Sequence, residues 1–142
     1  MNLMSWEECN KDFLRKVEVD LERIDSLVKK ANQRLKRAES TKVSLDNVSF
    51  VVEDYYETIK ELLVAYLLKN GFKSKNHQCL ISYFYKSNPN YEREAFLISQ
   101  MSFFRNRLDY YGEDIPFEFY LENKNEFKLI INLLLKLIDK LK

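Results

Sequence analysis

Glycine and proline are scarce in this sequence, since each occurs only twice in 142 residues. Turn-dense folds such as β-sandwiches and Rossmann units need special backbone angles at many positions, so this scarcity argues against them. No apolar run approaches the roughly 20 residues that span a bilayer, and the first residues lack the cationic and apolar stretches of a signal peptide. The sequence therefore predicts long helices with few breaks, in a soluble protein that is not exported.

Cysteine and histidine are equally scarce. Cys9 and Cys79 lie far apart in the chain, neither has a second cysteine nearby, and His77 is the only histidine. This pattern indicates neither a zinc site nor a disulfide framework, and nothing in the chain implies a metal or any other cofactor. A reducing cytoplasm is accordingly the expected location.

Apolar residues at helical spacing are abundant, in a composition that is 46% hydrophobic. They recur every three or four residues, which is the period of one face of a helix. The helices predicted from this spacing cover about 8–39, 47–70, 76–86, 91–110 and 118–142. At this length one core is expected, so the predicted fold class is an all-α, up-and-down bundle of about five helices in a single domain, 1–142.

Charge of one sign is also lacking. Lysine and arginine total 23 and aspartate and glutamate total 22, so nothing draws the whole chain to nucleic acid or to an anionic membrane. The basic segment 29–42 and the acidic segment 46–61 end and begin neighbouring helices, and we expect them to pair with each other. Lys69, Lys73 and Lys75 have no such complement and are better candidates for a polyanion site.

Short connections favour antiparallel packing of successive helices. On that rule, the first, third and fifth predicted helices run one way and the second and fourth run the other. The C-terminal ends of the second and fourth helices would then share one pole. There we expect Lys73, Lys75 and His77 to lie near Arg105 and Tyr110.

The most informative segment of the chain is 105–112, with the sequence RNRLDYYG. Arg105 lies at the edge of the apolar stripe of its helix, where a cation needs a partner. One interpretation pairs it with Asp109 one turn later, close to a helix end where arginines complement the macrodipole. The other has Arg105 and Asn106 bind a phosphate, the arginine through its bidentate fork and the amide by orienting the oxygens.

His77 has the one side chain whose unperturbed pKa lies near physiological pH. In the first turn of a helix, such a residue is usually a partly exposed packing residue. A catalytic role is the alternative, because we expect His77 to lie close to Arg105.

Five segments carry a resemblance to a known family: 15–38 in the first helix, DYYE at 54–57, GFKS at 71–74, the residues 77–83, and above all RNRLDYYG at 105–112. With its helices in this order, nearly the whole chain resembles the HEPN family (higher eukaryotes and prokaryotes nucleotide-binding). The last segment is similar to the most diagnostic motif of that family, an arginine followed by a polar residue and then by a histidine four to six positions further on.

Active HEPN proteins look like metal-independent endoribonucleases whose motifs face each other across a dimer. The resemblance implies that Arg105 stabilises charge on the scissile phosphate and that Asn106 positions it. Tyr110 stands where the histidine belongs, and a phenol is a poor general base at neutral pH. Tyr110 can still donate a proton, and His77 is the alternative base from a neighbouring helix. Arg107, with Lys73 and Lys75, is a candidate for binding substrate.

The expected function is therefore that of a HEPN-like protein that binds RNA or nucleotide. It would be the toxin-type member of a toxin and antitoxin pair, with ribonuclease activity weak or lost. The alternative is a noncatalytic helical subunit that dimerises and regulates a nucleotidyltransferase. The expected partners are a second copy of the chain, RNA or nucleotide, and a small nucleotidyltransferase antitoxin, with no membrane.

Overall fold

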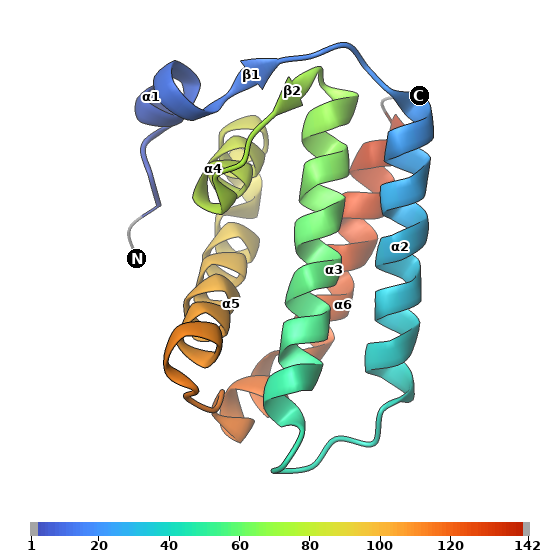
Figure 1. Cartoon of the computed structure of the whole chain (residues 1–142), viewed down its shortest axis with the longest axis vertical. Helices are drawn as coiled ribbons and strands as arrows, with labels where there is room; N and C mark the ends of the chain where they lie inside the picture. The colour runs from blue at the N-terminus through green and yellow to red at the C-terminus, as the bar shows by residue number, and fades with distance from the viewer. Residues whose placement is uncertain (1–2, 141–142) are drawn as a thin grey trace.

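A computed structural model describes residues 3–140, which form a bundle of helices (Figure 1). The long helices are α2 (Leu21–Ser40), α3 (Val48–Lys69), α5 (Glu92–Tyr111) and α6 (Phe117–Lys140). The shorter elements are α1 (Trp6–Glu8), the π-helical turn η1 (Cys9–Phe13), α4 (His77–Ser87) and the 3₁₀ turn η2 (Pro89–Tyr91). Two short strands, β1 (Arg15–Lys16) and β2 (Phe72–Lys73), complete the chain. The predicted all-α helical bundle is confirmed.

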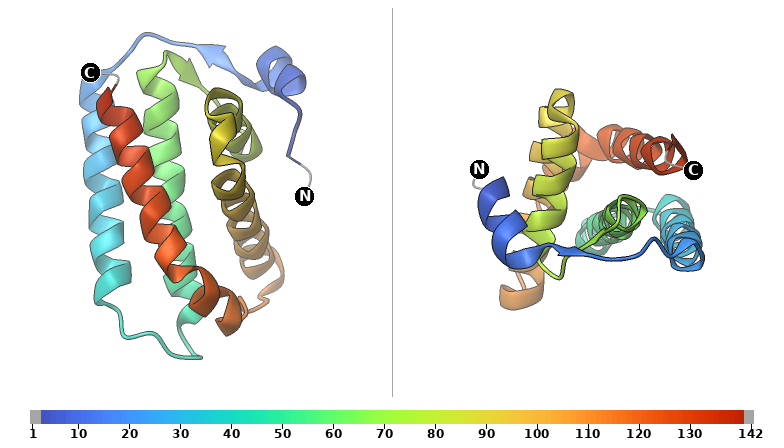
Figure 2. Two further views of the ribbon diagram at one scale, coloured as in Figure 1. Left: turned by 180° about the vertical axis from the view of Figure 1, so that it is seen from behind. Right: turned by 90° about the horizontal axis from the view of Figure 1, so that it is seen from above.

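Helix α3 is the central element of the bundle. Of its 22 residues, 15 are buried, and they lie all around its circumference rather than on one stripe. A helix that is apolar on every side must be covered on every side. Accordingly α3 packs against α2 and α6 on one side and against α4 and α5 on the other (Figure 2).

The buried residues of α2 recur every seven positions, as Ile24, Ala31 and Ala38. A seven-residue spacing keeps one seam of a helix against its neighbour, and alanines in that seam let the two backbones approach closely. Helices α2 and α3 therefore form a tight antiparallel pair that begins the bundle.

Ion pairs border the seam between α2 and α3. Arg34 Nε lies 2.6 Å from Glu61 Oε1, and the guanidinium of Arg37 hydrogen-bonds both carboxylate oxygens of Asp54. The predicted pairing between the basic end of the first helix and the acidic start of the second is confirmed for these two pairs, whereas Glu57 of the same acidic segment pairs with Arg105 instead. The positive charges of Arg34 and Arg37 are consequently neutralised by carboxylates of α3.

Helix α5 runs antiparallel to α3. Contacts between the two helices show this, since residues later in α3 contact residues earlier in α5. Glu53 of α3 contacts Asp109, whereas Glu57, one turn later, contacts Arg105. The expectation that these two helices point the same way is wrong. The physical reason is that α4 has only 11 residues and crosses the bundle instead of running its length (Figure 2).

The first long helix begins later than predicted. Asp20 caps α2 by accepting a hydrogen bond from the backbone N–H of Arg23, so the helix starts at Leu21 and not near residue 8. The preceding residues pass across one end of the bundle, where β1 pairs antiparallel with β2 (Figure 1). The apolar spacing that predicted a helix through Phe13 and Val17 is incidental, because these side chains belong to this crossing segment.

The N-terminal segment is held against α4 by a disulfide between Cys9 and Cys79. Ser82 Oγ donates a hydrogen bond to the carbonyl of Met4 at 2.7 Å, and the ring of Trp6 packs against a tyrosine of α4. The expectation of a chain without a disulfide is wrong. The two cysteines meet through the tertiary fold, which their distance in the sequence does not reveal.

The remaining helix boundaries agree with the prediction, apart from the predicted end of the last helix at 142, which lies outside the described residues. Gly71 and Gly112 have φ angles of 82° and 64°, in the left-handed region expected just past a helix end. None of the helices between residues 3 and 140 combines the length and the apolar character that crossing a bilayer requires.

Candidate functional site

Arg105 and His77 come together beside Glu57, in the middle of α3. Arg105 projects from α5 and places Nη2 3.1 Å from Glu57 Oε1. His77 projects from the first turn of α4 and is close enough for the charges of Arg105, Glu57 and Lys60 to act on it. The structure thus places His77 near Arg105 as expected, but on the side of the bundle and not at a shared pole.

Carboxylates hold the guanidinium of Arg105 on two sides. Besides Glu57, Asp109 lies one turn further along α5, with its Oδ2 3.1 Å from Arg105 Nε. This second contact is an ion pair rather than a hydrogen bond, because the buried Nε–H does not point at an acceptor. The Arg105 side chain is 21% exposed. Pairing with Asp109 was one of the two interpretations of the sequence, whereas the part played by Glu57 was missed.

Glu53 and Asp109 form a carboxyl pair next to this guanidinium. Burial raises the pKa of Glu53, and its hydrogen bond to Asp109 and the negative charge of Asp109 raise it further. A proton shared between two carboxyl groups relieves their repulsion, which explains the direction of the shift. The cluster therefore contains three acidic side chains and two cationic ones. The acidic residues are Glu53, Glu57 and Asp109, and the cationic residues are Arg105 and Lys60.

Replacing Glu53 with glutamine is expected to stabilise the protein at high pH and to change little at low pH. Because the folded state raises the pKa of this carboxyl above the unfolded value, it favours the protonated form. The stability that protonation contributes is present at low pH and is lost as the pH rises through the folded pKa. Glutamine keeps a hydrogen-bond donor and has no proton to lose.

Urea denaturation of Glu53→Gln and of the parent at pH 4 and at pH 8 measures this difference. The matched control is Glu122→Gln, an exposed position in α6. Stability profiles that run parallel for Glu53→Gln and the parent across this range would contradict the carboxyl pair.

The pKa of His77 is lowered, first by burial and then by the positive charges of Lys60 and Arg105, while the carboxylate of Glu57 opposes the shift. The imidazole is therefore neutral at physiological pH. A neutral imidazole is the form that accepts a proton, which is what a general base requires.

Asn106 and Tyr110 lie on another stripe of α5. Successive residues of an α-helix are separated by about 100° around its axis, so a residue next to Arg105 in sequence faces a different direction. The side chain of Tyr110 is 76% exposed, and Asn106 is exposed as well. The motif does not form one cluster, because Arg105 faces α3 while these two residues face away from it.

Arg107, near the end of α5, forms an ion pair with Glu113. Its Nε donates a hydrogen bond to Glu113 Oε2 at 2.6 Å, and its guanidinium lies over the rings of Phe103 and Tyr111. Glutamate neutralises the cation locally, and the stacked rings fix its orientation. Arg107 therefore contributes little free positive charge for a polyanion.

Lys73 and Lys75 were expected to lie close to Arg105, and for Lys73, which β2 holds against β1 at one end of the bundle, this expectation is wrong. Both lysines line a shallow pocket of about 240 Å³, together with Arg15 of β1, at the end of the bundle where α3 finishes. Lys69, the third member of this group in the sequence, is 8% exposed and is not a surface residue. Arg105 contacts Glu57 in the middle of α3, and it therefore lies away from this end of the bundle.

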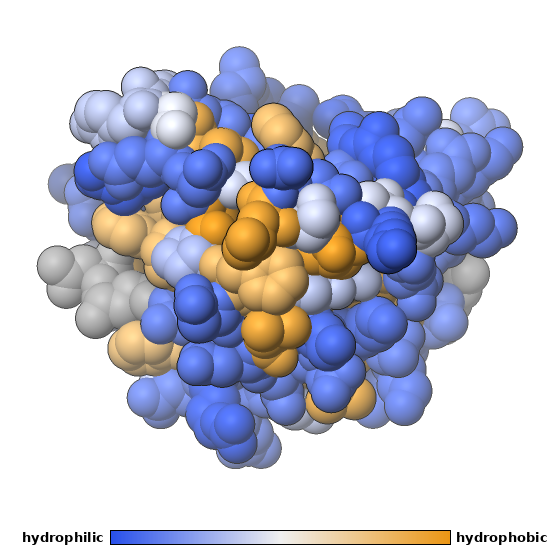
Figure 3. Space-filling view, turned by 90° about the horizontal axis from the view of Figure 1, so that it is seen from below, coloured by the Kyte–Doolittle hydropathy of each residue, from blue (hydrophilic) through white to orange (hydrophobic). Residues whose placement is uncertain are grey.

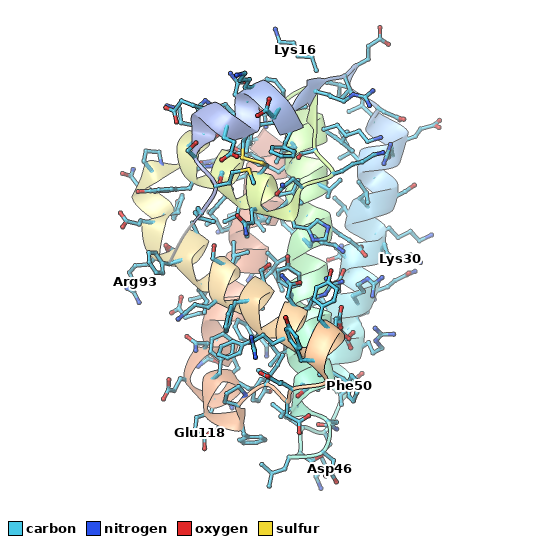
Figure 4. The ribbon with its side chains drawn as sticks, turned by 60° about the vertical axis from the view of Figure 1, so that its left-hand side comes forward. Lys16, Lys30, Asp46, Phe50, Arg93 and Glu118 are labelled. Atoms are coloured by element: carbon cyan, nitrogen blue, oxygen red, sulfur yellow. A yellow bond between two sulfur atoms is a disulfide. The ribbon has the colours of Figure 1, made fainter. Side chains whose placement is uncertain are left out.

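Exposed apolar side chains gather at the opposite end, where α3 begins and α5 finishes. Seen from below, this end shows a hydrophobic patch at its centre (Figure 3). Phe50 in the first turn of α3 is 60% exposed, and Tyr111 in the last turn of α5 is 69% exposed. Phe50 lies close to this end in the side-chain view, near Asp46 (Figure 4). Patches of this kind commonly mark contacts with other macromolecules.

No protein-family model matches the chain, and no curated protein or solved structure matches it either. Within residues 3–140, no group of three or more His, Cys, Asp or Glu side chains is placed to hold a metal ion. The class that the structure itself defines is an all-α helical bundle, with a charged cluster where α3, α4 and α5 meet.

Proposed function

We propose that this chain is a HEPN-like protein that binds RNA or nucleotide through the guanidinium of Arg105, with ribonuclease activity weak or lost. The convergence of Arg105 and His77 on one region of α3 is the main support for it. A guanidinium can hold a phosphate, and a neutral imidazole can accept the proton of a ribose hydroxyl. Cleavage of RNA without a metal uses these two groups together with a proton donor for the 5′-oxygen that leaves.

The carboxylates around Arg105 and the position of Tyr110 both argue against efficient cleavage. A phosphate that approaches Arg105 must displace Glu57 or Asp109, and it is repelled by the carboxylate that remains. Tyr110 stands at the position of the family histidine, yet its phenol faces solvent on another stripe of α5. His77 is then the base that remains for any residual cleavage.

Arg105→Ala is expected to weaken binding of labelled single-stranded RNA about tenfold or more, because a charge-assisted bidentate contact is lost. Fluorescence anisotropy in the presence of EDTA measures the affinity, and gel analysis of the RNA ends detects any slow cleavage to cyclic phosphates. Arg105→Lys keeps the charge without the bidentate fork, and it should bind with intermediate affinity.

Arg93→Ala is the matched control, because Arg93 is an exposed arginine at the start of the same helix (Figure 4). Circular dichroism establishes that each variant is folded. Equal RNA affinities of the Arg93→Ala and Arg105→Ala variants would rule out a phosphate contact at Arg105.

A second candidate function is that of a noncatalytic subunit that binds a second copy of the chain or a nucleotidyltransferase. The exposed apolar side chains at the end of α5 and the start of α3 favour it. Pairing of Arg105 with carboxylates is compatible with this function as well. A parent protein that binds no RNA in the same assay would favour this second candidate.

A cytoplasmic location, which the sequence predicted, is also part of the proposal. It was expected because the cysteines showed no sign of pairing. The disulfide between Cys9 and Cys79 removes that reason, since such bonds persist mainly in oxidising compartments.

A further inference from the structure

A groove between α4 and α5 is lined by residues other than Arg105. Its volume is about 530 Å³, which suits a ligand the size of a nucleoside. Amide and hydroxyl side chains are prominent in its walls: Gln78, Ser99, Gln100, Ser102 and Asn106. Asn106 thus belongs both to this groove and to the RNRLDYYG segment.

None of the described residues that line this groove is charged, although 32% of the residues of the chain are charged. An ion entering the groove would find no opposite charge there. A neutral group with hydrogen-bond donors and acceptors would find matching amides and hydroxyls. Because Leu3, Ile81 and two phenylalanines line the groove beside these amides and hydroxyls, its walls favour an uncharged ligand with both apolar and polar surface.

Ser99 is the strongest indication that the groove has a ligand. The residue is 8% exposed, and its Oγ is buried without a hydrogen-bond partner. Buried hydroxyl groups in native proteins are nearly always hydrogen-bonded, so an unpaired one calls for a partner. Since Ser99 lines the groove, a bound molecule can supply that partner.

Phe103 adds an aromatic surface to the same groove. Its side chain is 57% exposed, and its ring meets the ring of Phe104 edge to face, with the centroids 5.7 Å apart. The guanidinium of Arg107 lies over one face of this ring, 5.8 Å from its centroid, so a flat ligand would stack on the opposite face. A planar ligand is therefore favoured over a branched one.

We infer that this groove between α4 and α5 binds a nucleobase. A carboxamide presents one donor and one acceptor side by side, which matches the donor and acceptor on the edge of a base, and a phenyl ring stacks on its face. Asn106 and Gln78 supply carboxamides from the two helices, and Phe103 supplies the ring. The inference rests on the proposed function, because the base belongs to the RNA or nucleotide proposed above.

Isothermal titration calorimetry with adenosine, guanosine, cytidine and uridine tests the inference on the full chain. Nucleosides carry no phosphate, so the assay separates the groove from Arg105. At least one nucleoside should bind with a Kd of about 1 mM or tighter. Asn106→Leu should weaken that binding about tenfold, because a base edge would lose its polar partner. Ser99→Ala, a small change that does not threaten folding, should also weaken it.

Gln33→Leu on the exposed side of α2 is the matched control, and it should bind nucleosides as the parent does. Arg105→Ala should also leave nucleoside binding unchanged. No heat of binding with any of the four nucleosides at millimolar concentration would overturn the inference. Equal affinities of the parent, Asn106→Leu and Ser99→Ala would overturn it as well.

The two proposals can fail separately. If RNA affinity depends on Arg105 and no nucleoside binds, the groove is not a base site and the proposed function stands. If nucleosides bind in a manner that depends on Asn106 and RNA affinity does not depend on Arg105, the phosphate contact fails and the groove remains a base site.

Discussion

Reduction of the disulfide between Cys9 and Cys79 is expected to lower the free energy of unfolding by about 4 kcal/mol. The bond joins residues separated by 70 positions, and a chain closed into so long a loop has far fewer unfolded conformations. Urea denaturation with and without dithiothreitol measures the difference. The double variant Cys9→Ala, Cys79→Ala should resemble the reduced parent.

Alanine is preferred to serine in that double variant because both cysteines are 0% exposed, and a hydroxyl there would need a partner. Dithiothreitol should have no effect on the double variant, which separates reduction from any other action of the reagent. Identical denaturation midpoints of the oxidised and reduced parent would contradict the stabilising role of the bond.

Phe127→Ala is expected to destabilise the protein by about 3–5 kcal/mol. Phe127 of α6 is 0% exposed, and its ring centroid lies 5.5 Å from that of Tyr55 in α3 and 5.9 Å from that of Phe119. Removing the ring leaves a cavity where α6 covers the central helix. Thermal and urea denaturation measure the loss.

Leu129→Ala is the matched control, since it shortens an apolar side chain of the same helix that is 58% exposed. It should change stability by less than about 0.5 kcal/mol. A comparable loss in both variants would mean that α6 is not packed on α3 through Phe127.

Most helices were predictable because their signals are local. The spacing of apolar residues marks each helix, and Gly71 and Gly112 end their helices through their own backbone angles. The first helix was the exception. Periodic spacing continues upstream of Asp20, but the cap at Asp20 and the pairing of β1 with β2 take precedence over it.

The relative directions of the helices were not predictable from the same signals. The up-and-down rule treats every helix as running the full length of the bundle, and α4 does not. Its crossing reverses α5 relative to the expectation, and this separates Lys73 from Arg105. The disulfide escaped prediction for a related reason, since it depends on where α4 lies.

In the candidate site, too, the contacts within one helix were predictable and the contacts between helices were not. The ion pair of Arg105 with Asp109 follows from their spacing of one helical turn. The contributions of Glu53 and Glu57 depend on which face of α3 meets α5. Their place in the acidic segment 46–61 pointed instead to the basic end of α2, where Asp54 and Glu61 of the same helix do pair.

The disulfide also determines how the chain transmits a mechanical load. Residues 9 to 79 form a closed covalent ring that contains all of α2 and α3. Tension applied between the two ends of the chain passes through the bonded sulfur atoms and bypasses that ring. At about 3.5 Å per residue, roughly 240 Å of contour length stays out of the load path until the bond is reduced.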